Sequence, residues 1–141
     1  MKPRRFNPKI DKLFFIIAAP TAVLLLGMTV AFAFLSPISV LFVMLPVDIF
    51  TMYFIISPLF GYAELRESTL FIRFGFFMKR EIPYRAIRGT SLERKLYADS
   101  MLSLKNSLDH VNVKYNRFDL VSISVKENED FINELKLRLP K

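Results

Sequence analysis

The sequence predicts an α+β membrane protein, in which a hairpin of two transmembrane helices precedes a small domain of antiparallel strands and one C-terminal helix. The first observation is a pair of long apolar runs, residues 13–35 and 38–60, with Ser36-Pro37 between them. The second is the pattern beyond residue 61, where apolar residues alternate with polar ones as in half-buried strands. The third is a change near the C-terminus to a period of about 3.6 residues, as in an amphipathic helix.

Both apolar runs are long enough to cross a bilayer. Residues 13–35 carry no charge, and residues 38–60 carry only Asp48. At a rise of about 1.5 Å per residue, each run exceeds the thickness of about 30 Å of a hydrocarbon core. The short Ser36-Pro37 turn makes the pair a helical hairpin, so both of its ends must lie on the same side of the membrane. The predicted organisation is a basic cytoplasmic head over 1–12, transmembrane helices over 13–35 and 38–60, and a folded domain over 61–141.

The distribution of basic residues predicts the orientation of the hairpin. Basic residues crowd the head before the first span, whereas the turn between the spans has none. They are Lys2, Arg4, Arg5, Lys9 and Lys12. By the positive-inside rule, both termini lie in the cytoplasm of a multi-pass inner (plasma) membrane protein, and the head can also contact anionic membrane lipids. Ala31-Phe32-Ala33 resembles a signal-peptidase site, but a long apolar run followed by a second span disfavours cleavage.

Asp48 is the candidate polar site inside the membrane. It lies near the middle of the second run, where an ionisable side chain is costly and usually faces protein or water. Symmetry of the hairpin places it near Gly27, which would permit close approach of the two helices. One interpretation makes Asp48 a proton or ligand site, and the other makes it a structural carboxyl, protonated or bonded to a neighbouring helix. The absence of a second charge in either span favours the structural interpretation, and association of chains through the spans stays open.

Alternation of apolar and polar residues predicts the strands of the domain. Leu70, Ile72 and Ile87 are expected in the core, and Gly75 is expected at a turn. His110 falls in the polar phase of its strand and is expected to be solvated. The predicted strands are 62–67, 69–74, 78–83, 86–94, 110–115 and 120–125, with a turn at 116–118 and a short strand plus loop over 97–107.

The last segment predicts an amphipathic helix from about Lys126 to Leu139, stopped by Pro140. Ser124 and Glu127 have the spacing of a capping box. The apolar face of this helix comprises Phe131, Ile132, Leu135 and Leu139. A small bent sheet has open ends, and we expect the helix to cover one of them.

The residues that catalysis or metal binding require are scarce. The chain has no Cys, a single His and four Gly, which leaves no thiolate site, no confident catalytic triad and no Gly-rich phosphate loop. The acidic residues at 127–130 suit the start of a helix. Outside the head, the basic excess is mild and does not form the dense stripe of a nucleic-acid binder. The sequence therefore predicts no enzyme, no cofactor, no metal and no nucleic acid.

Three stretches carry a resemblance to a known family. They are Leu70–Phe77 followed by Glu81-Ile82-Pro83-Tyr84 and Ile87; Ser103-Leu104 leading to Ser107-Leu108-Asp109; and Ile123-Ser124 with Phe131-Ile132, Leu135-Lys136 and Arg138. Together with the preceding spans, they resemble the small, membrane-tethered bacterial pleckstrin-homology (PH) domains. The resemblance implies a PH-like antiparallel β-barrel or sandwich with a capping helix, and no known catalytic activity. One relative in this wider group resembles an immunity protein against the bacteriocin sublancin.

These observations favour a membrane-anchored binding module that contacts lipid and a protein or peptide partner at the inner membrane face. The candidate contacts pair aromatic rings with positive charge, and they are Phe76, Phe77, Lys79, Arg80, Arg85 and Arg88. An alternative is a bacteriocin-immunity or envelope-stress resistance protein that intercepts a membrane-active peptide. A third hypothesis is a subunit of a transporter or membrane enzyme, to which Asp48 contributes.

Overall fold

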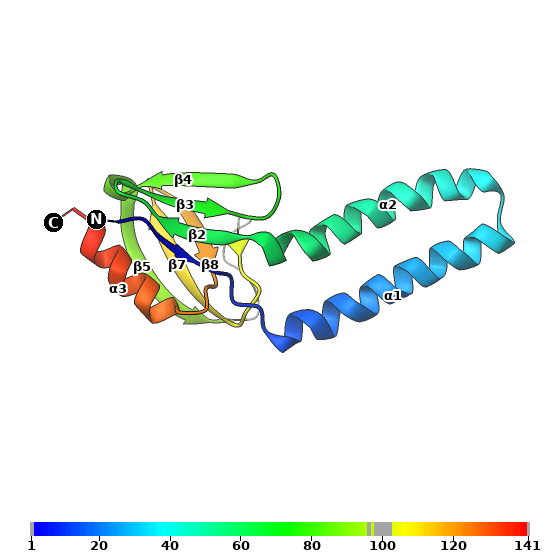
Figure 1. Ribbon diagram of the computed structural model, residues 1–141, viewed down its shortest axis with the longest axis horizontal. Coiled ribbons are helices and arrows are strands. Elements are labelled where there is room, and N and C mark those ends of the chain that lie inside the picture. The colour runs from blue at the N-terminus through cyan, green and yellow to red at the C-terminus, as the bar shows by residue number, and fades with distance from the viewer. Residues whose placement is uncertain (1, 96, 98–102, 141) are drawn as a thin grey trace. The chain divides into compact units, whose positions relative to one another are not determined.

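The computed structural model describes residues 2–95, 97 and 103–140 of the chain (Figure 1). It begins with two long apolar helices, α1 (Lys12–Leu35) and α2 (Ile38–Ile56), and a 3₁₀ turn over Ser57–Phe60 continues α2. Both helices are long and apolar enough to cross a membrane, and their bounds agree with the predicted spans. Ser36-Pro37 separates them because proline has no N–H to extend the hydrogen bonding of α1.

A first antiparallel sheet follows the helices in the chain. Its strands are β1 (Arg4–Phe6), β2 (Tyr62–Leu65), β3 (Thr69–Arg73) and β4 (Lys79–Pro83), in that spatial order. Ala63 and Leu65 on β2 and Leu70 and Ile72 on β3 are fully buried, as their alternation predicts. Gly75 has a φ of 130°, a value that favours glycine, and this conformation lets the chain reverse between β3 and β4.

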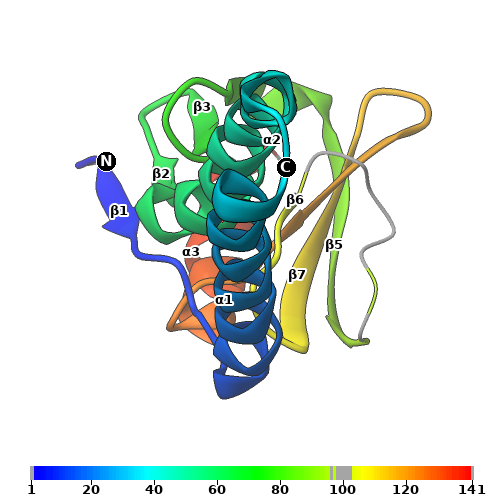
Figure 2. The same ribbon diagram turned by 90° about the vertical axis from the view of Figure 1, so that its right-hand side faces the viewer.

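The 3₁₀ turn Tyr84–Ala86 leads into a second sheet. Its strands are β5 (Ile87–Arg94), β6 (Ser103–Leu104), β7 (Asp109–Tyr115) and β8 (Asp119–Ile123), in the order β5-β7-β8-β6 with β6 parallel to β8. Figure 2 shows β1, β2 and β3 on one side of the domain and β5, β6 and β7 on the other. The strand and loop predicted over 97–107 fall partly on residues 98–102, which lie outside the described residues.

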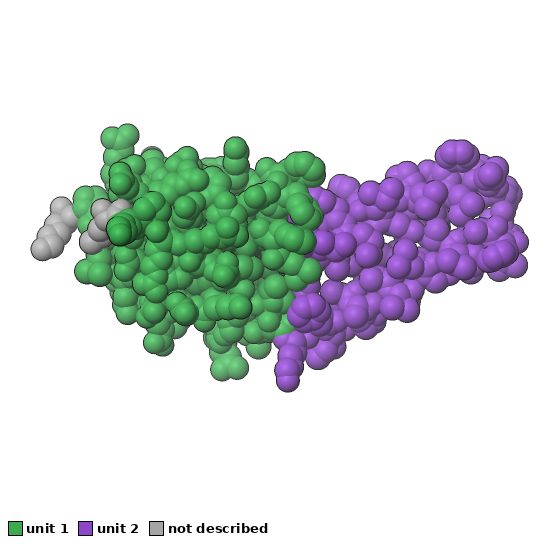
Figure 3. All heavy atoms as spheres, in the orientation of Figure 1, with its two compact units in different colours: residues 1–11, 58–141 green, residues 12–57 purple. Residues whose placement is uncertain are grey.

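The N-terminal segment corrects the predicted organisation, which treats residues 1–12 as a head apart from the domain. β1 pairs with β2, Arg4 opposite Leu65 and Phe6 opposite Ala63. The chain then crosses to the second sheet, where Pro8 bridges Val125 and Ile10 bridges Asn106. Residues 1–11 and 58–141 therefore form one compact unit, and residues 12–57 form another (Figure 3). The helical hairpin is an insertion between the first two strands of the domain.

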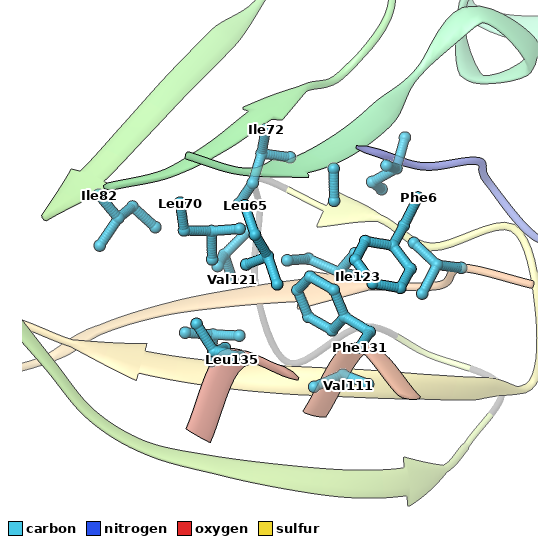
Figure 4. Close-up of a cluster of buried hydrophobic side chains, with 14 of the residues drawn as sticks. Phe6, Leu65, Leu70, Ile72, Ile82, Val111, Val121, Ile123, Phe131 and Leu135 are labelled. Carbon is cyan, nitrogen blue, oxygen red and sulfur yellow. The ribbon is translucent and has the colours of Figure 1, made fainter. Parts of the chain in front are cut away.

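The core lies between the two sheets and under the C-terminal helix α3 (Asn128–Arg138). Figure 4 shows Phe131 and Leu135 of α3 among side chains from both sheets, and both residues are fully buried, as predicted. The ring of Phe131 meets that of Phe6 edge-to-face, with centroids 5.2 Å apart. The described strands make a PH-like sandwich of two sheets, not a closed barrel, which decides between the two predicted forms.

The predicted capping box at Ser124 is wrong. α3 begins at Asn128, and no side chain caps Glu127, the residue before it. Ser124 is buried, and its hydroxyl donates instead to the carbonyl oxygen of Asp109 at 3.1 Å. The amide oxygen of Asn128 accepts from the backbone N–H of Val125 at 3.0 Å, which fixes the chain just before the helix. Tertiary contacts outcompete the local motif here.

The prediction of a solvated His110 is also wrong, because the side chain is fully buried. Its strand, β7, lies between β5 and β8, so neighbouring strands flank it on both edges. Asn112, in the same polar phase, is buried too and accepts from the hydroxyl of Ser122 at 2.6 Å. Alternation distinguishes the two faces of this strand, but here the polar face is buried as well.

Candidate functional site

The turn between β3 and β4 presents an apolar tip. Arg73 and Lys79 form the last strand pair, and the backbone N–H of Phe74 donates to the carbonyl of Met78 at 2.8 Å. The guanidinium of Arg73 braces the turn by donating to the carbonyl oxygens of Gly75 at 2.7 Å and Phe76 at 3.2 Å. Three apolar side chains project from it, and we call Phe76, Phe77 and Met78 the apolar turn.

The exposure of this turn is unusual for side chains of this size. Phe76, Phe77 and Met78 are 40%, 83% and 50% exposed. Scattered exposed apolar residues are normal on protein surfaces, whereas adjacent ones mark an interaction surface. Sequence analysis found the two Phe residues but missed Met78, because it counted Met78 as the first residue of the next strand.

Phe60 ties the apolar turn to the end of the second apolar helix. The rings of Phe60 and Phe76 pack with centroids 4.8 Å apart. Phe60 is the last residue of the second candidate span, Ile38–Phe60, and belongs to the compact unit that holds the two sheets. The turn therefore lies next to the point where the chain leaves that span. Phe60 was absent from the predicted site, because this contact depends on tertiary structure.

The structure separates the predicted basic contacts. Lys79 directly follows the apolar turn and is exposed, whereas the guanidinium of Arg80 lies over the ring of Tyr115, 5.6 Å from its centroid. Arg85 and Arg88 come after the far end of β4, where Pro83 pairs with Thr69. The five-residue strand β4 places this end about 13 Å from Lys79. Phe76, Phe77 and Lys79 form one cluster, and Arg85 and Arg88 lie elsewhere.

Hydrogen bonds hold together the two points where the hairpin joins the domain. The backbone N–H of Asp11 donates to the carbonyl of Asn106 at 2.9 Å, and the amide of Asn106 donates to the carbonyl of Pro58 at 3.4 Å. The Asp11 carboxylate accepts from the hydroxyl of Ser107 at 2.7 Å and from the N–H of Leu108 at 3.0 Å. We call these five residues the junction clasp.

The junction clasp shifts the titration of its carboxyl group. The hydrogen bond from Ser107 is the main reason that the pKa of Asp11 lies below its usual range. Burial acts against this shift, while the N–H of Leu108 and the charges of Lys9 and Arg94 add to it. Asp11 therefore holds its clasp as a carboxylate.

Asp48 has a partner in the hairpin. The hydroxyl of Thr29 donates to one oxygen of the Asp48 carboxyl at 2.5 Å, and both side chains are buried, at 9% and 5% exposure. The other oxygen has no hydrogen-bond partner among the described residues. Sequence symmetry placed Gly27 opposite Asp48, but no atom lies within 4 Å of a side chain built at Gly27, so this glycine does not mediate the contact. A bond between the helices is what the structural interpretation of Asp48 expects.

The described residues offer little for ion chemistry. No group of three or more His, Asp or Glu side chains gathers there as a metal site. The absence of catalysis and of cofactors stays a prediction. What the site can do is present apolar and basic side chains at the foot of the hairpin.

The two-sheet sandwich with a C-terminal helix, joined to two apolar helices, defines a PH-like domain with candidate membrane-anchor helices. The family of bacterial PH domains matches residues 62–139. Because the match covers more than half of the chain, the protein belongs to that family. No curated protein and no solved structure matches the chain. The match begins at β2, so the N-terminal strand and the hairpin lie outside it.

Proposed function

We propose that this protein is a membrane-anchored, non-enzymatic binding module at the inner face of the cell membrane. In this proposal the hairpin anchors the domain, the apolar turn enters the lipid interface, and a protein or peptide partner supplies specificity. The observation that carries it is the packing of Phe76 on Phe60, which places the exposed turn beside the end of a candidate span. Family membership supports binding over catalysis, because PH domains are generally non-catalytic binding modules.

The energetics favour orientation by lipid. Complete burial of a Phe or Met side chain contributes about 1.5–3 kcal/mol, and the exposed fractions of Phe77 and Met78 leave much of that to be gained. Each basic residue near an anionic leaflet adds about 1 kcal/mol, so Lys79 reinforces the contact. A domain already tethered by two helices needs only such weak contacts to hold one face toward the membrane.

Depth-dependent quenching tests this orientation. The chain has no Cys, so Phe77→Cys gives a single site for an environment-sensitive fluorophore in the full-length protein. The matched control is Phe118→Cys, another exposed Phe on a turn of the same domain, at 86% exposure against 83%. In nanodiscs with spin-labelled lipids we expect quenching at position 77 and little at position 118. Equal quenching at both positions, or none at position 77, would contradict the proposal.

A further inference from the structure

A pocket of about 350 Å³ lies where the N-terminal segment meets the chain that returns from α2. Arg5 and Asn7 line it from the N-terminal segment, and Lys126 lines it from the chain before α3. Ile10, Leu59 and Phe60 supply its apolar wall. All of these residues belong to the compact unit that contains the two sheets.

The two cations of the pocket lack carboxylate partners. Among the described residues, neither Arg5 nor Lys126 forms an ion pair, whereas Arg4 pairs with Glu127, Asp130 and Glu134. The guanidinium of Arg5 lies over the ring of Tyr62, 3.8 Å from its centroid, which restrains it without neutralising it. No described Asp or Glu lines the pocket. Its charge is therefore positive and available to an anion.

Backbone pairing positions the cations on both sides of this pocket. The N–H of Lys126 donates to the carbonyl of Asn7 at 3.1 Å, and Pro8 bridges Val125 beside it. Lys126 is thus held against the segment that carries Arg5. The contrast is a pocket of about 580 Å³ before α3, where Lys9 and Lys126 meet Asp109, Glu127, Glu129 and Asp130. Carboxylates compensate the lysines there, so that pocket does not favour an anion.

The apolar wall of the pocket identifies the kind of anion. Ile10 precedes α1, and Leu59 and Phe60 end the second candidate span. A free phosphate ion would use only the cations, whereas a phospholipid would place its phosphate at Arg5 and Lys126 and its glycerol and upper acyl chain along the apolar wall. We propose that this pocket binds the headgroup phosphate of an anionic phospholipid from the leaflet where the spans end. The inference deepens the proposed function, because it rests on membrane anchoring of the hairpin.

Native mass spectrometry of the full-length protein in a non-ionic detergent tests the pocket. The probe is a short-chain phosphatidylglycerol, and the variants are Arg5→Gln, Lys126→Gln and both together. Loss of one charge-assisted contact is expected to weaken binding about tenfold, and the double variant should lose more. The control with the same charge loss is Lys114→Gln with Arg117→Gln, two exposed residues of β7 and the turn after it. That control should bind as wild type does.

Two further arms keep the result decisive. Arg5→Lys keeps the charge and should bind within a few-fold of wild type, which separates loss of charge from loss of folding. Inorganic phosphate at equal concentration should not displace the lipid. Unchanged lipid binding by the double variant would overturn the proposal, and so would displacement by phosphate alone. The quenching experiment at position 77 reports on the apolar turn separately, so either proposal can fail while the other holds.

Discussion

At the scale of single residues, Phe131 connects the parts of the domain that are farthest apart in the chain. Its ring is fully buried and meets Phe6 of β1, while α3 carries it across the open side of the sandwich. Arg138, ten-fold less visible to a sequence reader because it looks like a surface residue, is about as buried. Its side chain is 4% exposed and donates to Glu134 and to the carbonyls of Leu65 and Arg66.

Replacing Phe131 should destabilise the domain strongly. Phe131→Ala is expected to lower the free energy of unfolding by about 3–5 kcal/mol, because it leaves a cavity against Phe6. Hydrogen exchange of the full-length protein in detergent measures this change. Phe118→Ala is the control, since that ring is 86% exposed and should change stability by less than about 0.5 kcal/mol. Similar effects of the two substitutions would show that the α3 packing is wrong.

Acid should weaken the domain through two carboxylates. The hydrogen bond from Lys95, with others from Asn112 and Ser91, lowers the pKa of Glu93 to about 2. The pKa of Asp11 is lowered as well, chiefly by Ser107. A lowered folded-state pKa gives stability that is present above the unfolded-state pKa and is lost as pH falls through the folded-state value. Stability should therefore hold at neutral pH and fall between about pH 4.5 and pH 2.

The variants Asp11→Asn and Glu93→Gln test this assignment. Each should be less stable than wild type at pH 7, and the difference should shrink toward pH 2 because the wild-type carboxylates become protonated there. Urea unfolding across this pH range measures the difference. A difference that stays constant with pH would assign the effect to lost packing instead of charge.

At the scale of secondary-structure elements, β1 decides where the domain begins. It pairs with β2, carries the buried Phe6 and continues to the second sheet through the Pro8–Val125 bridge. The family match at 62–139 leaves it out. A fragment limited to the matched residues would expose an edge of β2 and one side of Phe131 to water.

We therefore expect the fragment 62–141 not to fold alone. Replacing residues 12–57 by a short Gly-Ser linker should instead give a folded domain, because Asp11 and Pro58 both bond to Asn106 and are already close. Dispersion of amide signals in NMR spectra compares the two chains. A well-dispersed spectrum from the fragment would show that β1 is dispensable.

Elements with strong local patterns could be predicted from the sequence, and those built from distant contacts could not. The spans, β2 to β4, β7 and α3 follow their apolar periodicity. β1 was missed because Arg-Arg-Phe has no pattern, and its partner lies beyond the whole hairpin. For the site, adjacency in sequence found Phe76, Phe77 and Lys79. It wrongly grouped Arg85 and Arg88 with them, because strand β4 carries the chain away from the turn.

At the scale of the whole molecule, strand pairing bears on topology. Because β1 and β2 pair, both ends of the hairpin lie in one compartment. The basic residues near both ends favour the cytoplasm. We expect reporter fusions at residues 1 and 141 both to report a cytoplasmic location, and an external location for either one would contradict this topology. The immunity and transporter-subunit hypotheses stay untested predictions.

The position of the hairpin between β1 and β2 also has a consequence for biosynthesis. β1 leaves the ribosome first but has no partner until the hairpin and β2 have been made, a delay of roughly 3–11 s at about 5–20 residues per second. A chain that inserts only one of its helices would leave β1 and β2 on opposite sides of the bilayer, where they can never pair. The cytoplasmic domain thus reports on its own anchor, because it can form only after correct insertion. Chains that fail would display an unpaired strand and an open core, the features that proteases and chaperones recognise.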